Sequence, residues 1–217
     1  MLLYHLDKSH GLQEGIKLNL KNVYPSIEGT NTDIKDSPFI SLFSEGISNW
    51  GLSILDCNCS TIPAFFVGKS MSACINVGDL FEIKGEADSK LIEIVFELVR
   101  RLYFSHYPSR FQSIFAVGSI EEFIKWPELL QRNAHEVSLI DYDVYEISVP
   151  DNIPTFDSNW LKGGISAGID KGRFYYGVKI DSFFDFAYHY WNRDFTEAPR
   201  LEYLVKLPIK VGRKISH

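Results

Sequence analysis

Three polar side chains stand inside apolar, strand-like stretches that lie far apart in the sequence. His5 is near the start, Ser113 in the middle and Glu202 near the end. Each is flanked by residues of high β-propensity, which predicts three strands. Such a polar residue most often lies satisfied in the core or on the solvent face. Where it faces a cleft, it needs a partner or a chemical task, because burying an unpaired polar group is unfavourable. These residues are therefore candidate site residues that separate strands must bring together.

The middle stretch, residues 108–117, is predicted to be one buried strand. Alternation places four of its side chains on one face: Phe111, Ser113, Phe115 and Val117. A tight turn into a helix follows directly, and this arrangement commonly presents side chains to a ligand. The plainer interpretation is a core strand with one satisfied serine.

Three short motifs around these residues resemble the ADP-ribosyltransferases of the His–aromatic–Glu type, in their order and broad spacing. The motifs are Leu3-Tyr4-His5, Ser113-Ile114-Phe115-Ala116 and Glu202-Tyr203-Leu204-Val205. These enzymes share the fold of diphtheria toxin and the poly-ADP-ribose polymerases. Residues 42–46 and 108–113 are also similar to DUF2441, a bacterial family of unknown function that the resemblance places in the same fold. The resemblance implies one domain over residues 1–217, with split β-sheets and flanking helices.

The resemblance also assigns roles around NAD, which would serve as a substrate. Glu202 would hold a ribose hydroxyl and stabilise the positive charge that develops when the nicotinamide–ribose bond breaks. His5 would hydrogen-bond the adenosine ribose, and the backbone of Leu6 would hold the nicotinamide amide. Ser113 would orient Glu202 or the ribose.

Two further roles concern the rings and phosphates of NAD. Phe115, with Phe123 or Trp126 as a second ring, would sandwich the nicotinamide. Arg110 would reach the pyrophosphate, because the guanidinium fork suits phosphate oxygens. The family often has Tyr where this chain has Phe115, so stacking is kept and a hydroxyl is lost.

The function implied is transfer of ADP-ribose from NAD to nucleic acid or protein. A cytoplasmic bacterial toxin or anti-phage defence factor, with an antitoxin or inhibitor protein as a partner, is the setting that this analogy suggests. Two alternatives stay open. One is a catalytically inactive binding module that keeps the fold, and the other is a serine hydrolase built on Ser166.

The hydrolase alternative depends on Gly164-Ile165-Ser166-Ala167-Gly168, which matches the G-x-S-x-G nucleophile elbow. An elbow needs a helix after it, whereas a Tyr-rich strand is predicted here. Residues 163–172 are therefore better interpreted as a glycine-rich loop, which could cover the NAD site. A phosphate loop at Gly68-Lys69-Ser70 is excluded because its first glycine would fall on Pro63. The pair Cys57 and Cys59 lacks a second ligand pair at metal spacing, so zinc is not expected.

Composition limits the partners. The chain has 217 residues, 45% of them hydrophobic, and a net charge of -6 that argues against a broad nucleic-acid-binding face. A local groove stays open, because arginines and aromatic residues alternate within residues 100–111, as contacts to single strands require. The simpler interpretation puts Arg100 and Arg101 on the solvent face of a helix.

Three cysteines and no signal peptide indicate a reducing cytoplasm. No apolar run approaches about 18 residues, so no membrane span is expected.

The elements that must position these residues follow from periodicity and turn signals. Strands are predicted at residues 2–6, 16–20, 108–117, 143–149, 173–180, 201–206 and 209–213, with Pro208 marking a bend or a change of sheet. Helices are predicted at residues 88–105, from a capping box of Ser119 and Glu122, and from a capped start at Ser182. The first helix should bury Leu91, Ile94, Val95, Leu98, Val99 and Leu102. Strands outnumber helices, which favours an α+β fold.

Overall fold

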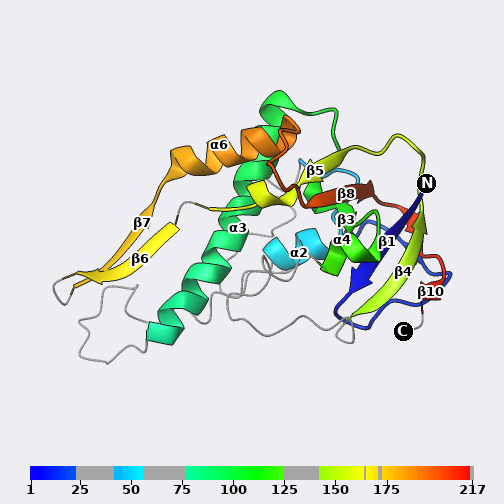
Figure 1. The fold of residues 1–217 in the computed structure, drawn as a ribbon, viewed down its shortest axis with the longest axis horizontal. Coiled ribbons are helices and arrows are strands. Elements are labelled where there is room, and N and C mark those ends of the chain that lie inside the picture. The colour runs from blue at the N-terminus through cyan, green and yellow to red at the C-terminus, as the bar shows by residue number, and fades with distance from the viewer. Residues whose placement is uncertain (23–41, 56–76, 125–141, 164, 171–172, 216–217) are drawn as a thin grey trace.

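The computed structural model describes residues 1–22, 42–55, 77–124, 142–163, 165–170 and 173–215 (Figure 1). The helices are α2 (Asn49–Leu55), α3 (Val77–Tyr103), α4 (Ile120–Ile124) and α6 (Ile180–Trp191), with 3₁₀ turns η4 (Arg110–Gln112) and η6 (Ser158–Trp160). The strands are β1 (Leu2–Asp7), β2 (Lys17–Leu18), β3 (Ser113–Ala116), β4 (Asp143–Ser148), β5 (Thr155–Asp157), β6 (Ile165–Asp170), β7 (Arg173–Val178), β8 (Leu201–Lys206), β9 (Ile209–Lys210) and β10 (Lys214–Ile215). Helices mixed with small antiparallel sheets confirm the predicted α+β class.

Two antiparallel sheets meet edge to edge. One has the strand order β1-β4-β10 and the other the order β3-β8-β5. Strands β1 and β3 face each other, and among the described residues one reciprocal pair of backbone hydrogen bonds joins them, between Tyr4 and Val117 at 2.9 Å each. We call this junction the seam. Because so few backbone bonds cross it, the two sheets are held together there mainly by side chains that pack across the junction.

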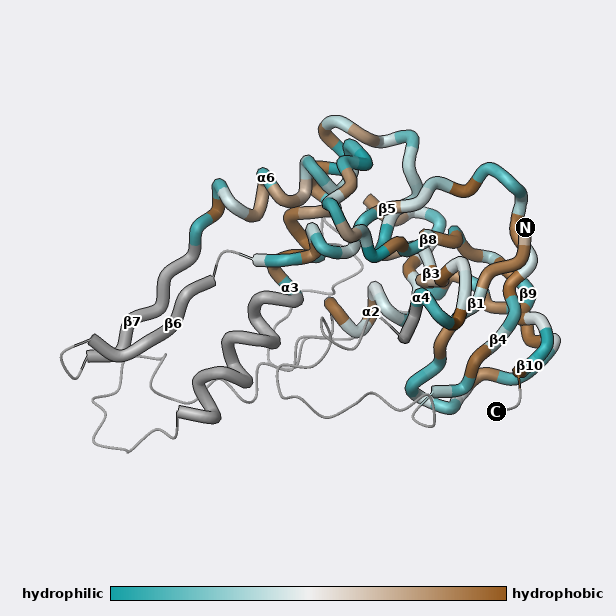
Figure 2. The backbone as a smooth tube through the Cα atoms, viewed as in Figure 1, coloured by the Kyte–Doolittle hydropathy of each residue, from teal (hydrophilic) through white to brown (hydrophobic). Residues whose placement is uncertain are grey.

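Two hydrophobic cores hold the sheets in place. One fills the space between the β3-β8-β5 sheet and the helices α3 and α6, with Phe96, Phe156 and Trp191 fully buried. The other lies where the two sheets meet and includes Leu3 and Val205. Figure 2 shows the hydrophobic stretches of β1 and β4 that contribute to this second core. Trp191 also donates from Nε1 to Phe96 O at 2.7 Å, which ties α6 to α3.

Helix α3 buries charges where the sequence predicted apolar side chains. Ile94, Leu98 and Leu102 are 40%, 45% and 59% exposed, so that part of the predicted apolar face was wrong. The predictions for Val95 and Val99 are confirmed. The face turned toward the sheet carries three buried charged residues, Glu93, Glu97 and Arg100. This reversal is possible because each buried charge finds an oppositely charged partner.

The stretch predicted as one strand over residues 108–117 is divided. Its first half turns through η4, where Ser109 Oγ accepts a hydrogen bond from Phe111 N at 3.2 Å. Only the second half forms β3. The turn sends Phe111 into a separate cluster with Phe43 and Ile47, so Phe111 and Phe115 do not share one face as predicted. A local side-chain cap has therefore won over β-propensity here.

The predicted glycine-rich loop at residues 163–172 is also wrong. Residues 165–170 form β6, which pairs in an antiparallel hairpin with β7. Ser166 lies within the ladder, opposite Gly177. A nucleophile elbow requires a sharp turn from a strand into a helix, whereas the described residues 165–170 and 173–178 are two paired strands with Ser166 inside the first. The serine hydrolase alternative loses its structural basis.

Smaller predictions divide in the same way. The Ser119 cap is confirmed, since Ser119 Oγ accepts from Glu122 N at 3.1 Å, while the Glu122 carboxylate accepts from Gly118 N at 3.1 Å, one residue before the cap. The change of sheet at Pro208 is confirmed, because β8 and β9 belong to different sheets. The capped start at Ser182 is wrong, because α6 begins after Lys179. The predicted strand at residues 16–20 is reduced to β2, whose partner is β9.

Helix α6 ends in a Schellman motif with an unusual residue. Arg193 N donates to Tyr190 O, and Asp194 N donates to His189 O, both at 3.1 Å. Arg193 has a φ of 60°, in the left-handed region. This position is usually glycine, because a Cβ makes that conformation unfavourable. An arginine is therefore held here against a local backbone preference.

Candidate functional site

Four buried polar side chains meet between α3, α6 and β8, and we call them the Arg110 cluster: Glu93, Arg110, Tyr190 and Glu202. Arg110 donates from Nε and Nη2 to the two oxygens of Glu93, both at 2.9 Å. Its Nη1 donates to Tyr190 Oη at 2.8 Å and also to Glu202 Oε1. Tyr190 Oη donates to the same Glu202 oxygen. The cluster thus places two carboxylates around one guanidinium.

Glu202 is 1% exposed, on the second residue of β8. Alternation points it, with Leu204, toward the helices. Burial raises the pKa of Glu202, although Arg110 and the Tyr190 hydroxyl act in the opposite direction. Burial also raises the pKa of Tyr190 well above its ordinary value, so this phenol is a hydrogen-bond donor. Arg110 stays charged, because Glu202 and Glu93 outweigh the burial that would lower its pKa.

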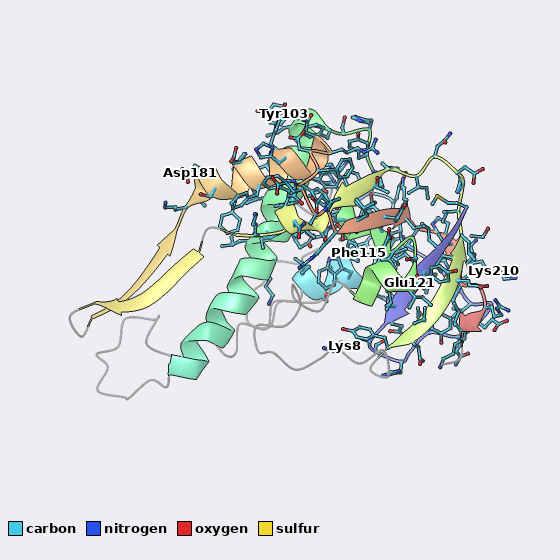
Figure 3. The ribbon with its side chains drawn as sticks, in the orientation of Figure 1. Lys8, Tyr103, Phe115, Glu121, Asp181 and Lys210 are labelled. Carbon is cyan, nitrogen blue, oxygen red and sulfur yellow. The ribbon has the colours of Figure 1, made fainter. Side chains whose placement is uncertain are left out.

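Phe115 lies beside this cluster. The Arg110 Cζ atom is 4.5 Å from the centroid of the Phe115 ring, a cation–π distance. Trp50 of α2 also contacts Phe115, with the two rings nearly perpendicular and their centroids 5.6 Å apart. Figure 3 shows Phe115 next to α2. Both rings are at least partly exposed, so a further flat group could stack on them.

His5 lies at the seam. Its Nδ1 is 2.7 Å from Phe115 O, so the imidazole bonds the carbonyl of the strand that faces β1. Next to the Tyr4–Val117 pair, the seam is therefore bridged by the His5 side chain and not by a further backbone hydrogen bond. Burial lowers the pKa of His5, which favours the neutral ring. A neutral ring that donates from Nδ1 keeps Nε2 as a hydrogen-bond acceptor.

The structure brings together part of the predicted site. Glu202, Arg110 and Phe115 are in contact, and His5 reaches them through the Phe115 backbone. Ser113 does not orient Glu202, because its Oγ donates to Ser109 O at 2.7 Å. The groups that orient Glu202 are Arg110 and Tyr190.

Three other predicted contacts concern Arg110, Leu6 and the second ring. Arg110 is 4% exposed and bonded to carboxylates, so it positions Glu202, and its pyrophosphate contact stays a prediction. Leu6 pairs with Val144 in the β1–β4 ladder, and its contact with the nicotinamide amide is untested. The ring of Phe123 and the whole of Trp126 lie outside the described residues.

Sequence reasoning missed Glu93, Tyr190 and Trp50. The signal for Glu93 was its spacing from Glu97 and Arg100, because residues four and seven apart lie on one face of a helix. For Tyr190 the clue was an aromatic residue with a polar tip near the end of an otherwise apolar helix. Neither clue identified Glu202 as the partner, since that contact depends on how α3 and α6 pack.

A second set of charges lies one helical turn from Glu93, and we call it the Glu97 cluster: Glu97, Arg100, Arg101 and Ser109. Arg100 donates from Nε and Nη2 to Glu97 at 2.9 and 2.8 Å. Ser109 Oγ donates to Glu97 Oε2 at 2.8 Å. Arg101 Nε lies 2.7 Å from Glu97 Oε1, but it is not aligned for a hydrogen bond.

Two cavities open near this second cluster. One of about 490 Å³ is lined by His106, Tyr107 and Arg193 with residues of the β4–β5 connection. Another of about 250 Å³ is lined by Arg100, Arg101 and Lys206 with polar neighbours. His5, Ser113, Phe115 and Glu202 line neither of them, so a common cleft for these four residues stays a prediction.

Comparison with known families decides where this chain belongs. The model of a family described as a protein of unknown function, DUF2441, matches residues 3–217. The chain belongs to this family. No curated protein matches it. Membership confirms the similarity of residues 42–46 and 108–113 to DUF2441, while a relationship to the ADP-ribosyltransferases stays a prediction.

Two other properties of this DUF2441 chain concern ligands and membranes. In the described part of the chain, no three His, Cys, Asp or Glu side chains gather in a way that could hold a metal ion. None of the helices there is both long and apolar enough to cross a bilayer.

Proposed function

We propose that this protein is a mono-ADP-ribosyltransferase that moves ADP-ribose from NAD to a macromolecular acceptor, with Glu202 as the catalytic carboxylate. One observation carries the proposal. The strands that bear His5, Phe115 and Glu202 are β1, β3 and β8, and they lie next to one another across the seam. A split sheet bearing these three side chains is what the resemblance to the His–aromatic–Glu transferases implies.

The chemistry of Glu202 fits this role. Both hydrogen bonds from Arg110 and Tyr190 fall on Oε1, which leaves Oε2 to accept from a ribose hydroxyl. When nicotinamide leaves with the bonding electron pair, positive charge develops on the ribose, and the fixed carboxylate stabilises it. The acceptor's nucleophilic atom then bonds the ribose C1′ and gives up its proton.

The neighbouring groups would hold the two ends of NAD. The nicotinamide would stack on Phe115, with Trp50 beside it, because both rings lie at the edge of the Arg110 cluster. His5 Nε2 would accept a hydrogen bond from the adenosine ribose. Since Glu202 is buried against Arg110 and Tyr190, NAD binding has to be accompanied by a rearrangement that uncovers its second oxygen.

The test uses NAD labelled in its adenylate phosphate, with protein and nucleic acid from a lysate as acceptors. We expect the parent protein to transfer label to one of these classes. Glu202→Gln should lower transfer at least about 100-fold, the effect of removing one fixed stabilising group. The matched control is Glu121→Gln, which alters an exposed glutamate of α4 and should retain full activity (Figure 3). NAD affinity, measured by calorimetry, should change by less than about fivefold in both variants, since neither change alters the ring stacking.

Other outcomes separate the alternatives. A parent protein that binds NAD without consuming it would be the inactive binding module. Turnover that survives Glu202→Gln would rule out the assigned catalytic residue. Ester hydrolysis that disappears in Ser166→Ala would restore the hydrolase.

A further inference from the structure

The two cavities near the Glu97 cluster adjoin each other. Both are lined by Tyr107 and Pro108, in the connection between α3 and η4. Because the two cavities share these residues, we take their linings together and call them the Tyr107 face. Its charged or ring-bearing members that matter here are Arg100, Arg101, His106, Tyr107, Arg193 and Lys206.

The Tyr107 face is basic on a chain whose net charge is -6. Within the described lining of both cavities, four cations stand against one carboxylate, Glu45. Glu45 pairs with Lys206 at 2.7 Å, but the two side chains are 62% and 49% exposed. Such an exposed pair contributes little, so a phosphate can take the place of the carboxylate. Arg100 and Arg101 share Glu97, which leaves positive charge in excess beside the smaller cavity.

Arg193 gives an independent reason to regard this face as a binding surface. It occupies the left-handed position of the Schellman motif, where glycine would be free of strain. Its Nε donates to Thr155 O at 3.1 Å, which keeps the guanidinium at the larger cavity. Nothing in the backbone requires an arginine here. A residue held against local preference points to a functional contact.

Aromatic rings complete the surface. Tyr107 is half-buried, stacked near Trp191 and edge-on to Phe156 at 5.2 Å, so its ring is held firmly. The exposed His106 ring lies 4.1 Å from the Tyr107 ring. The Tyr107 ring is packed against Phe104, Phe156 and Trp191, so the exposed His106 ring is the one on which a base can stack, with cations nearby for its phosphates.

We propose that the Tyr107 face binds a single-stranded segment of nucleic acid. A long duplex fits poorly, because neutralising its phosphates needs a denser basic surface than these four cations give. The face is also close to the candidate site. Lys206 stands four residues beyond Glu202 on β8, about 13 Å along the strand. Tyr107 contacts Phe156, whose partner in the ladder is Glu202. That the bound strand is the acceptor of ADP-ribose rests on the proposed function.

Fluorescence anisotropy with labelled oligo(dT) and oligo(U) of about 12 nucleotides, a length within the usual site size, tests the binding without NAD. The combined variant Arg193→Gly and Lys206→Gln should weaken binding at least about tenfold. The slope of log K against log salt should flatten by about 0.7 for each phosphate that the variant no longer neutralises. The matched control is Lys8→Gln with Lys210→Gln, which removes two exposed cations that line neither cavity. It should bind within about twofold of the parent, because neither lysine lies near the bound strand.

Two single variants separate folding from binding. Arg193→Gly should melt no lower than the parent, because glycine relieves the backbone strain, yet it should bind more weakly. His106→Ala should weaken binding about fivefold with the salt slope unchanged, since it removes stacking and not charge.

Three results would overturn the proposal: no binding by the parent, equal weakening in the lysine control, or equal affinity for a duplex of the same length. The outcome is separable from NAD turnover. If oligonucleotides bind through this face while NAD is never consumed, the proposed function fails and the binding face stands. If NAD is consumed and no oligonucleotide binds, the reverse holds.

Discussion

The Arg110 cluster and the Glu97 cluster are built on the same face of α3, one turn apart, with opposite stoichiometry. The first surrounds one guanidinium with two carboxylates, Glu93 and Glu202. The second surrounds one carboxylate, Glu97, with two guanidiniums. The surplus charge is therefore negative in one and positive in the other.

The two clusters also differ in where their net charge lies, the negative one in the interior and the positive one near the surface. The negative surplus lies deep between α3, α6 and β8, where burial raises the pKa of Glu202. The positive surplus borders a cavity that opens to solvent, where Arg101 is partly exposed. The comparison teaches that the net charge left after pairing determines what a buried ion cluster can do. A cluster with one more carboxylate than cations, kept away from water, suits chemistry, and a cation at the surface suits anion binding.

The largest effect is expected where the buried guanidinium is removed. Arg110→Met would leave Glu93 and Glu202 close together without a counter-charge, and should lower the free energy of unfolding by about 3–5 kcal/mol. Urea denaturation at about pH 7, where both carboxylates would otherwise ionise, measures this. The control, Arg101→Met, leaves Arg100 with Glu97 and should cost about 1 kcal/mol or less. Equal losses of stability in the two variants would show that the clusters do not differ in the way described.

An intermediate effect is expected at the carboxylate of the other cluster. Glu97→Gln leaves Arg100 and Arg101 without their shared partner and weakens a charged hydrogen bond from Ser109, so it should cost about 2 kcal/mol. The exposed Glu45 provides the matched control, because Glu45→Gln should change stability by about 0.5 kcal/mol or less. If the Glu97 variant were as stable as this control, the cluster would not contribute to folding.

The smallest effect, whose trend with pH is informative, is expected for Glu202→Gln. Near neutral pH the variant should lie within about 1 kcal/mol of the parent, because Gln keeps the volume and a carbonyl acceptor for Tyr190 and Arg110. The folded state raises the pKa of Glu202, so the unfolded chain releases this proton first as pH rises. Ionisation thus favours unfolding above about pH 4.3, the unfolded value.

The variant lacks this titration, so its stability relative to the parent should increase from about pH 4 toward about pH 7. Denaturation midpoints of both proteins across that range give the comparison. Groups such as His5 titrate in both proteins and cancel in the difference. A relative stability that decreases with pH would mean that Glu202 is paired more favourably in the fold than its burial indicates.

Local sequence patterns predicted those strands and helix starts that show a regular alternation of apolar and polar residues or a capping signal. Alternation identified β1, β4 and β8 almost to the residue, and the capping box located the start of α4. The polar residues inside two of these strands, His5 and Glu202, were rightly suspected of having specific partners. These inferences needed only the period of a strand and the cost of burying polar groups.

What failed depends on contacts between distant segments. The buried face of α3 could not be read from its apolar residues, because Glu93 and Glu97 are buried by arginines that come later in the chain. The shortening of the strand predicted at residues 108–117 has a local cause, the Ser109 cap, together with a distant one. Arg110 has to turn back toward α3, and the η4 turn directs it there.

The seam has a consequence for how the chain folds. Tyr4 of β1 bonds Val117 on one side and pairs with Glu146 on the other, so both neighbours come more than a hundred residues later in the sequence. Strand β1 is therefore left unpaired until most of the chain has collapsed around it. Loop closure over such separations slows folding, because its entropic cost comes before the contacts that offset it. The β3-β8-β5 layer can form without β1, so refolding should end with the insertion of β1 between two preformed edges, and the seam should be the last place to order and the first to open.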